Sequence, residues 1–173
     1  TGFRVERADA GRLATNYAVV AGRLVPIDLP ESSIYLDQPA FLFGGAGLVS
    51  TPRDYDRFLR MIGGLGVLDG KRVMSEAAVR LGTSNLLPPA VPTGSIMGMK
   101  LDAFGAGGRV GTGAEEGIFG WSGAAGTVGM VDMRSGLTSA IYAQFMPPDA
   151  LALLPEFQQA LRADATALLE RRQ

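Results

Sequence analysis

The sequence contains no cysteine and no histidine among its 173 residues. Without cysteine there is no disulfide and no thiolate nucleophile, and without either residue type there is no zinc site of the usual kind. A Ser-His-Asp triad is excluded as well, because no imidazole is present to accept the serine proton. Any serine chemistry would need a lysine or a tyrosine as its base, and the only lysines are Lys71 and Lys100.

The sequence also lacks an excess of either charge and lacks long apolar runs. It has 16 basic and 17 acidic residues, and its net charge is −1. Nucleic acids and anionic membranes select basic surfaces, so we expect neither as a partner. Glycine or proline interrupts the uncharged stretches, which predicts no transmembrane helix, and the first residues show no signal-peptide pattern. Cytoplasmic and periplasmic locations are both compatible with the sequence.

The clearest local signal is a helix that begins after Thr51. Thr51 suits the N-cap position, Pro52 suits the first helical position, and Asp54 can close a capping box. An apolar stripe at helical spacing follows, formed by Tyr55, Phe58, Leu59 and Ile62. Further on, the pattern predicts an Asp-Gly turn at 69–70 and a short helix from Ser75 to Gly82.

The last third of the sequence predicts antiparallel strands followed by a helix. Three β-rich runs cover residues 117–123, 126–133 and 137–145, and Arg134-Ser135-Gly136 joins the last two as a hairpin turn. A C-terminal helix follows Pro147-Pro148. Earlier in the chain, 17–27 predicts a hairpin, 96–104 a single strand and 105–113 a Gly-rich loop.

Two catalytic or cofactor motifs are only partly present. Gly45-x-Gly47 precedes a helix, but Ser50 stands where a dinucleotide-binding fingerprint needs its third glycine. Gly120-Trp121-Ser122-Gly123-Ala124 lacks the last glycine of a nucleophile elbow, and no histidine could activate Ser122. We therefore expect no cofactor and no metal ion, and we do not interpret Ser122 as a nucleophile.

The order of several segments carries more information than any one of them. A Gly-rich turn leads to Leu-Val-Ser-Thr at 48–51, and Asp-Tyr-x-Arg-Phe-Leu at 54–59 follows. Leu-Asp-Gly-x-Arg-Val-Met-Ser comes at 68–75, and Trp-Ser-Gly at 121–123. This order resembles the C-terminal part of the serine β-lactamase and penicillin-binding-protein-like family, in which Lys-Thr-Gly occupies the position of Trp-Ser-Gly. A tryptophan at this position resembles the pattern of the esterase-type members, the family VIII carboxylesterases. Taken alone, Trp121 is more typical of a core residue in a glycine-rich strand.

The resemblance implies a fold and a set of site residues. The fold would be the α+β sandwich of β-lactamases, an antiparallel sheet with flanking helices, present as its C-terminal part over residues 1–173. Residues 1–95 would be mostly helix and loop, and residues 96–173 would hold the strands and the C-terminal helix. The backbone N–H of Ala124 would be an oxyanion-hole donor. Trp121, Ser122 and Gly123 would bind substrate, with Trp121 as an apolar wall that favours acyl esters and Ser122 as a hydrogen-bonding group.

Two motifs of that family are missing from the chain. Its nucleophile motif is S-x-x-K, but Leu68 and Met97 stand three residues before the two lysines. No tyrosine is followed two residues later by asparagine, so the second motif is absent too. Thr1-Gly2-Phe3 resembles family sequence just downstream of both motifs. We therefore expect a C-terminal fragment or one chain of a split protein, and we expect the chain alone to be inactive.

These observations leave three functions open. The chain could be the C-terminal part of a serine hydrolase that cleaves small esters or lactams through an acyl-enzyme. It could instead be a non-catalytic binding module, or a structural half-domain that pairs with an N-terminal partner. Residues 137–145 carry neither charge nor proline, whereas natural edge strands are usually blunted by such residues. We expect the outer edge of this strand to meet the missing N-terminal segment or a second copy of the chain.

Overall fold

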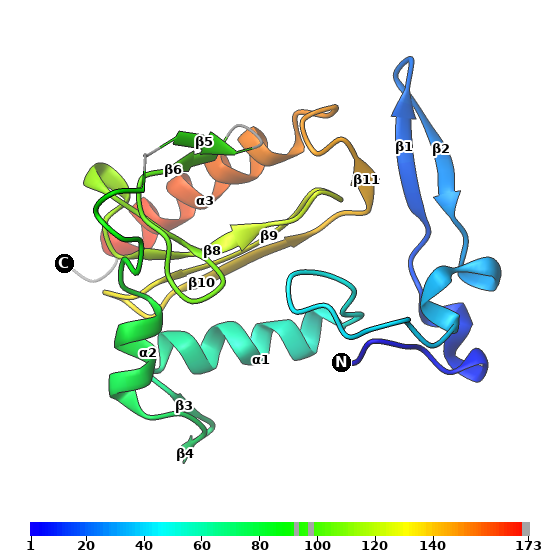
Figure 1. Ribbon diagram of the computed structural model, residues 1–173. Helices are drawn as coiled ribbons and strands as arrows, with labels where there is room; N and C mark the ends of the chain where they lie inside the picture. Colours follow the sequence, from blue (N-terminus) through cyan, green and yellow to red (C-terminus); the bar gives the residue numbers. More distant parts are fainter. Residues whose placement is uncertain (92–93, 97–98, 171–173) are drawn as a thin grey trace. The chain divides into compact units, whose positions relative to one another are not determined.

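The computed structural model describes residues 1–91, 94–96 and 99–170. These residues form two compact units (Figure 1). Unit 1 consists of Thr1, Phe43–Trp121 and Val128–Ala140, and unit 2 consists of Gly2–Leu42, Ser122–Thr127 and the residues from Ile141 onward. The architecture is α+β, with antiparallel strand pairs and helices, as the sequence predicts. Among the described residues, no helix has the length and apolar character needed to cross a membrane.

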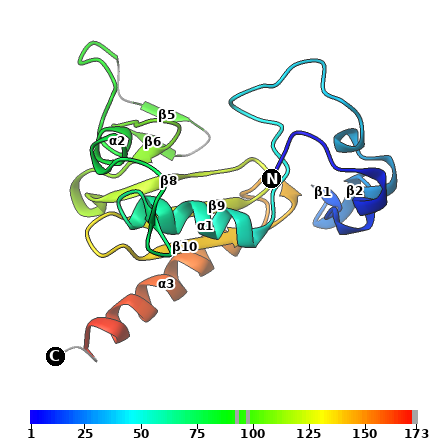
Figure 2. The same cartoon turned by 90° about the horizontal axis from the view of Figure 1, so that it is seen from below.

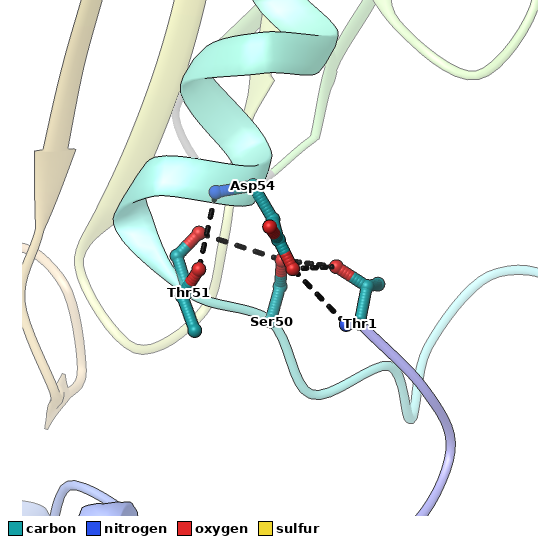
Figure 3. A network of polar contacts seen from close by, with 4 residues as sticks. All are labelled: Thr1, Ser50, Thr51 and Asp54. Carbon is teal, nitrogen blue, oxygen red and sulfur yellow. Dashed lines mark hydrogen bonds and ion pairs between the residues drawn. The ribbon is translucent and has the colours of Figure 1, made fainter.

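Helix α1, Pro52–Gly63, begins where the sequence predicts. The Thr51 hydroxyl accepts a hydrogen bond from the Asp54 N–H at 3.1 Å, which confirms Thr51 as the N-cap. The Asp54 carboxylate accepts hydrogen bonds from the Thr1 amino group at 3.1 Å and the Thr1 hydroxyl at 3.0 Å. The Ser50 hydroxyl lies 2.8 Å from the Thr1 hydroxyl and completes this network (Figure 3). Asp54 thus ties Thr1 to the start of α1.

The elements after α1 also follow local sequence signals. Strands β3, Val67–Leu68, and β4, Lys71–Arg72, pair across the turn at Asp69-Gly70, where both residues have positive φ. Helix α2, Glu76–Gly82, is capped by Ser75, whose hydroxyl accepts from the Ala78 N–H. Both features confirm the sequence-based expectations.

A four-stranded sheet has most of its residues in unit 1. Its strands are β7, Arg109–Val110; β8, Ile118–Ser122; β9, Thr127–Asp132; and β10, Thr138–Tyr142. Their order in the sheet is β10-β9-β8-β7, so the three predicted β-rich runs are neighbours. The 3₁₀ turn η4, Gly113–Glu115, connects β7 to β8.

Two expectations for residues 96–113 were wrong. The predicted single strand at 96–104 is instead a pair, β5, Gly94–Ile96, and β6, Met99–Leu101, in antiparallel register. The segment predicted as a loop at 105–113 contains β7, which pairs with β8 through Val110↔Phe119. Glycine explains this packing, because a Cβ at Gly108 would lie 2.8 Å from the Phe119 ring. The missing side chain lets the backbone lie against that ring.

The core of unit 1 forms between α1 and the sheet. Figures 1 and 2 show α1 running alongside β9. Six buried side chains form one cluster: Leu59, Met61, Ile62, Val79, Phe119 and Val131. Each such side chain contributes roughly 1.5–3 kcal/mol through removal of apolar surface from water. The helical stripe predicted from the sequence supplies Leu59 and Ile62 to this cluster.

Unit 2 contains a second, three-stranded sheet. Strands β1, Asn16–Val20, and β2, Arg23–Asp28, form the predicted hairpin, and Ala21 and Gly22 at its turn both have positive φ. Strand β11, Phe145–Met146, pairs with β1 in parallel, which gives the order β11-β1-β2. The unit also has the 3₁₀ turns η1, Arg7–Arg12, η2, Pro30–Ser32, and η3, Ile34–Leu36. Its last element is helix α3, Leu153–Glu170.

The predicted strand at 137–145 is divided in the structure. β10 ends at Tyr142, and Phe145 belongs to β11. The backbone between them has other partners: the Gln144 carbonyl accepts from the Tyr17 N–H at 3.0 Å, and the Phe145 N–H donates to the Ala125 carbonyl at 3.1 Å. The hydrophobic pattern continues through 137–145, so it did not indicate this break.

Candidate functional site

Trp121 and Ser122 are the last two residues of β8. The register between β7 and β8 pairs Arg109 with Gly120 and Val110 with Phe119, so β7 stops short of Trp121. Consecutive residues of a strand present their side chains to opposite faces, so Trp121 and Ser122 face different sides of the sheet. The structure therefore places the predicted substrate-binding residues at the end of β8, beyond the residues that β7 covers.

The Trp121 ring is half-buried and contacts Phe104. The two rings meet edge to face, with centroids 5.3 Å apart and an interplanar angle of 90°. This is a favoured arrangement for aromatic pairs, because the positive edge of one ring meets the negative face of the other. Sequence reasoning missed Phe104, since no spacing rule connects it with Trp121.

Gly123 and the residues after it form a tight hairpin turn between β8 and β9. The Gly123 N–H donates to the Thr127 carbonyl at 2.7 Å, and the Gly126 N–H donates to the Gly123 carbonyl at 3.1 Å. Gly126 has a φ of 75°, the left-handed conformation that three-residue hairpin loops require at their last position. A Cβ at Gly123 would collide with the Thr127 hydroxyl. The glycines of the motif are therefore explained by the turn itself.

Ala124 is exposed at the first loop position of this turn. Within the described part of the chain, its N–H donates no hydrogen bond. An oxyanion donor must be unoccupied and fixed before the reaction, so that it can meet the charge that develops on the substrate oxygen. The hairpin fixes the Ala124 backbone on both sides and leaves this N–H available.

Two groups that could act as a base in the described part of the chain are Lys71 and Tyr55. Lys71 is exposed on β4. Burial raises the pKa of Tyr55, whereas a general base at neutral pH needs a lowered one. Over residues 1–91, 94–96 and 99–170, no three acidic side chains gather in a way that could hold a metal ion.

A cleft of about 460 Å³ lies in unit 1, at the other end of β8 from the motif. Ile118, the first residue of β8, lines it together with Met133, Asn85, Asp102 and Thr112. The Thr112 hydroxyl donates to the Asp102 carboxylate at 3.3 Å. None of the four predicted site residues lines this cleft, and sequence reasoning did not anticipate it.

Comparison with known proteins finds a family model that matches this chain and curated proteins that are similar to part of it. The family model described as Beta-lactamase matches residues 1–163. Protein Rv1367c of Mycobacterium tuberculosis strain H37Rv is 40% identical over 81 residues, which cover 47% of this chain and 20% of that protein. The chain thus spans a fifth of the length of the curated relatives that it matches.

Two solved structures are similar at low identity. One is a penicillin-binding protein homolog from Caulobacter crescentus, with a TM-score of 0.43 and 21% identity over 54% of this chain and 25% of that one. The other is a provisionally named beta-lactamase from Bacteroides dorei DSM 17855, with a TM-score of 0.49 and 21% identity. That match covers 66% of this chain and 40% of the other.

Proposed function

Because the chain belongs to the Beta-lactamase family, we propose that it forms one wall of the active site of a serine hydrolase that cleaves small esters through an acyl-enzyme. In this proposal, Ala124 supplies an oxyanion donor, Trp121 contacts the acyl group, and Ser122 and Gly123 border the substrate. The chain provides these contacts to the substrate, and another segment provides the attacking serine and its base.

The unoccupied N–H of Ala124 is the observation that carries this proposal. It lies in a rigid turn directly after Trp121-Ser122-Gly123, at the position that the family resemblance assigns to an oxyanion donor. A single donor of this type contributes about 3–4 kcal/mol to transition-state stabilisation in acyl transfer. A turn of this type leaves the N–H of its first central residue unpaired, so the N–H of Ala124 is available to a substrate oxygen at no cost to the fold.

The preference for esters rests on Trp121. A lysine at this position would attract the carboxylate that β-lactams carry, whereas an indole offers only an apolar surface and one N–H donor. No residue from Gly117 to Val131 is charged, so no side chain in this segment replaces the positive charge of that lysine. An uncharged acyl ester is therefore the better substrate class for this site.

The nucleophile must come from outside residues 1–173 in this proposal. Neither lysine has a serine three residues before it, and no histidine is present. An oxyanion donor without an attacking group has no intermediate to stabilise. The 81 matched residues make up 20% of the length of the curated relatives, so most of each relative lies outside the match and leaves room for such a segment.

The contact with that segment is proposed to include β10. This strand is the last in the sheet order β10-β9-β8-β7, and Thr-Ser-Ala-Ile-Tyr carries no charge and no proline. Among the described residues β10 is an edge strand, and an edge strand of this composition readily adds another strand. The alternative occupant is a second copy of the chain.

Hydrolysis of p-nitrophenyl butyrate tests the proposal. We expect no turnover above background by the 173-residue chain, and turnover when it is combined with the family segment that carries S-x-x-K. Replacing the serine of that motif by alanine should abolish the activity. Ester binding with no turnover in the combined sample would instead favour a binding module. Turnover by the chain alone would refute the proposed division of roles.

A further inference from the structure

Phe104 makes an edge-to-face contact with the only tryptophan of the chain. Phe104 lies in the segment between β6 and β7, whereas Trp121 belongs to β8. Trp121 is half-buried as a residue, and its indole contacts the Phe104 ring. The contact therefore supports the indole, and the residue as a whole keeps surface that a ligand can reach.

The backbone of Phe104 is held by the segment that follows α2. The Asn85 side-chain carbonyl accepts hydrogen bonds from the Phe104 N–H and from the Leu87 N–H, both at 3.1 Å. The Phe104 carbonyl accepts from the Leu86 N–H at 2.8 Å. Both polar groups of the Phe104 backbone are thus paired with residues 85–86. An amide side chain that bridges two segments in this way restrains their separation.

The residues directly after Phe104 add a second restraint. Phe104 forms a β-bridge with Arg109, and the Gly105 N–H donates to the Gly108 carbonyl at 2.8 Å. The Ala106 N–H donates to the carbonyl of Gly82, the last residue of α2, at 2.7 Å. Phe104 is therefore anchored on both sides in sequence. Its ring is a fixed surface against which the indole packs.

We infer that Phe104 is a positioning residue that sets the orientation of the Trp121 indole and thereby the acyl-chain preference of the site. The inference rests on the proposed role of Trp121 as the acyl wall. An edge-to-face aromatic pair stabilises its geometry enough to change the population of that orientation by about two- to tenfold. Without the Phe104 ring, the indole would adopt other orientations more often. The surface that it presents to the acyl chain would then change shape.

Three variants separate a ring-specific role from general packing. Phe104→Leu keeps an apolar side chain and removes the ring, Phe104→Tyr keeps the ring, and Phe58→Leu is the matched control. Phe58 also belongs to an aromatic pair, with Tyr55 on α1, at a centroid distance of 5.8 Å. The control therefore removes a phenyl ring from an aromatic pair, tilted at 40°, that does not include Trp121.

Tryptophan fluorescence of the 173-residue chain gives the first readout. Because Trp121 is the only tryptophan, the emission maximum and acrylamide quenching report on this indole alone. We expect Phe104→Leu to shift the emission to the red and to increase quenching. Phe104→Tyr and Phe58→Leu should match the wild-type spectrum. An unchanged spectrum in Phe104→Leu would overturn the inference.

Ester kinetics give the second readout, with the chain combined with the segment that supplies the nucleophile. For Phe104→Leu we expect the KM for p-nitrophenyl butyrate to rise about two- to tenfold with little change in kcat, since a wall contacts ground state and transition state alike. The KM for p-nitrophenyl acetate should change less, and Phe104→Tyr should restore the butyrate value. A spectral shift without a change in this selectivity overturns the inference. Absence of hydrolysis by the wild-type combination refutes the proposed function instead, and the fluorescence result still decides whether Phe104 orients the indole.

Discussion

The ring of Tyr55 lies directly over Gly129, at the contact between α1 and β9. A Cβ at Gly129 would collide with Cε1 of that ring. The tyrosine therefore occupies the space that any other residue at position 129 would fill. Gly129 is a packing requirement of the core.

We expect Gly129→Ala to lower the free energy of unfolding by about 1–3 kcal/mol, because overpacking forces side chains or backbone to move. Urea unfolding measures this change. Gly44→Ala is the control, since a Cβ there meets nothing within 4 Å. In a Tyr55→Ala background the cost of Gly129→Ala should largely disappear. An equal cost in both backgrounds would contradict the proposed collision.

Asp132 makes stability depend on pH. Desolvation opposes its charged form, but hydrogen bonds from the Arg134 side chain and N–H and from the Ser135 hydroxyl outweigh this, so the pKa of Asp132 is lowered. A lowered pKa in the folded state stabilises the fold above the unfolded pKa of about 3.9, and this contribution is lost as the pH falls through the lower folded value. The loss begins near pH 4.

Unfolding measured from pH 6 down to pH 2 tests this expectation for Asp132. Asp132→Asn has no carboxylate to protonate, so its stability should decline less steeply over this range than that of the wild type. Glu31→Gln is the control, because it removes another, exposed carboxylate for which no hydrogen-bond partner is found among the described residues. Parallel pH curves for wild type and Asp132→Asn would contradict the prediction.

Ala124→Pro removes the proposed oxyanion donor without removing a hydrogen bond of the fold. Ala124 does not have positive φ, and proline is well tolerated at the first central position of such a turn. In the active combination we expect kcat to fall about 10²–10³-fold, as for the loss of other oxyanion donors. Ala124→Ser keeps the N–H and should retain activity. A full rate in Ala124→Pro would remove Ala124 from the mechanism.

Association of the chain should depend on the edge of β10. Tyr142, the last residue of β10, is 42% exposed, and Val20 at the tip of the β1–β2 hairpin is 55% exposed. We expect the purified chain to associate in sedimentation experiments, and Tyr142→Lys to weaken this association by blunting the edge. Val20→Lys, an equally drastic change elsewhere, should have little effect. A monomeric wild-type chain at high concentration would show that the edge does not recruit a partner.

The sequence predicted elements that depend on short-range chemistry. Thr51 and Ser75 as helix caps, and the turn at Asp69-Gly70, follow from side-chain and backbone preferences within a few residues. These preferences act between residues that are close together in the sequence, so they can be recognised without knowing the fold. The order of β8, β9 and β10 followed for the same reason, because short turns join them.

Long-range contacts could not be predicted in this way. The pairing of β7 with β8 depends on the fit of Gly108 against Phe119, and the contact of Phe104 with Trp121 depends on Asn85. Each relation joins residues that no periodic pattern connects. For the candidate site, the motif predicts roles for Trp121 and Ala124, whereas the contact of Phe104 with the indole emerged only from the structure.

The parallel pairing of Tyr17 with Phe145 bears on the order in which the chain can fold during synthesis. The β1–β2 hairpin needs only its own residues, so it can form soon after residue 28 leaves the ribosome. The other edge of β1 then waits for β11 while most of the chain is still being translated, which takes several seconds at about 5–20 residues per second. Closing so long a loop also carries an entropic cost that local hairpins avoid. We therefore expect the edge of β1 in a newly made chain to stay unpaired, and open to another chain, until Phe145 has been synthesised.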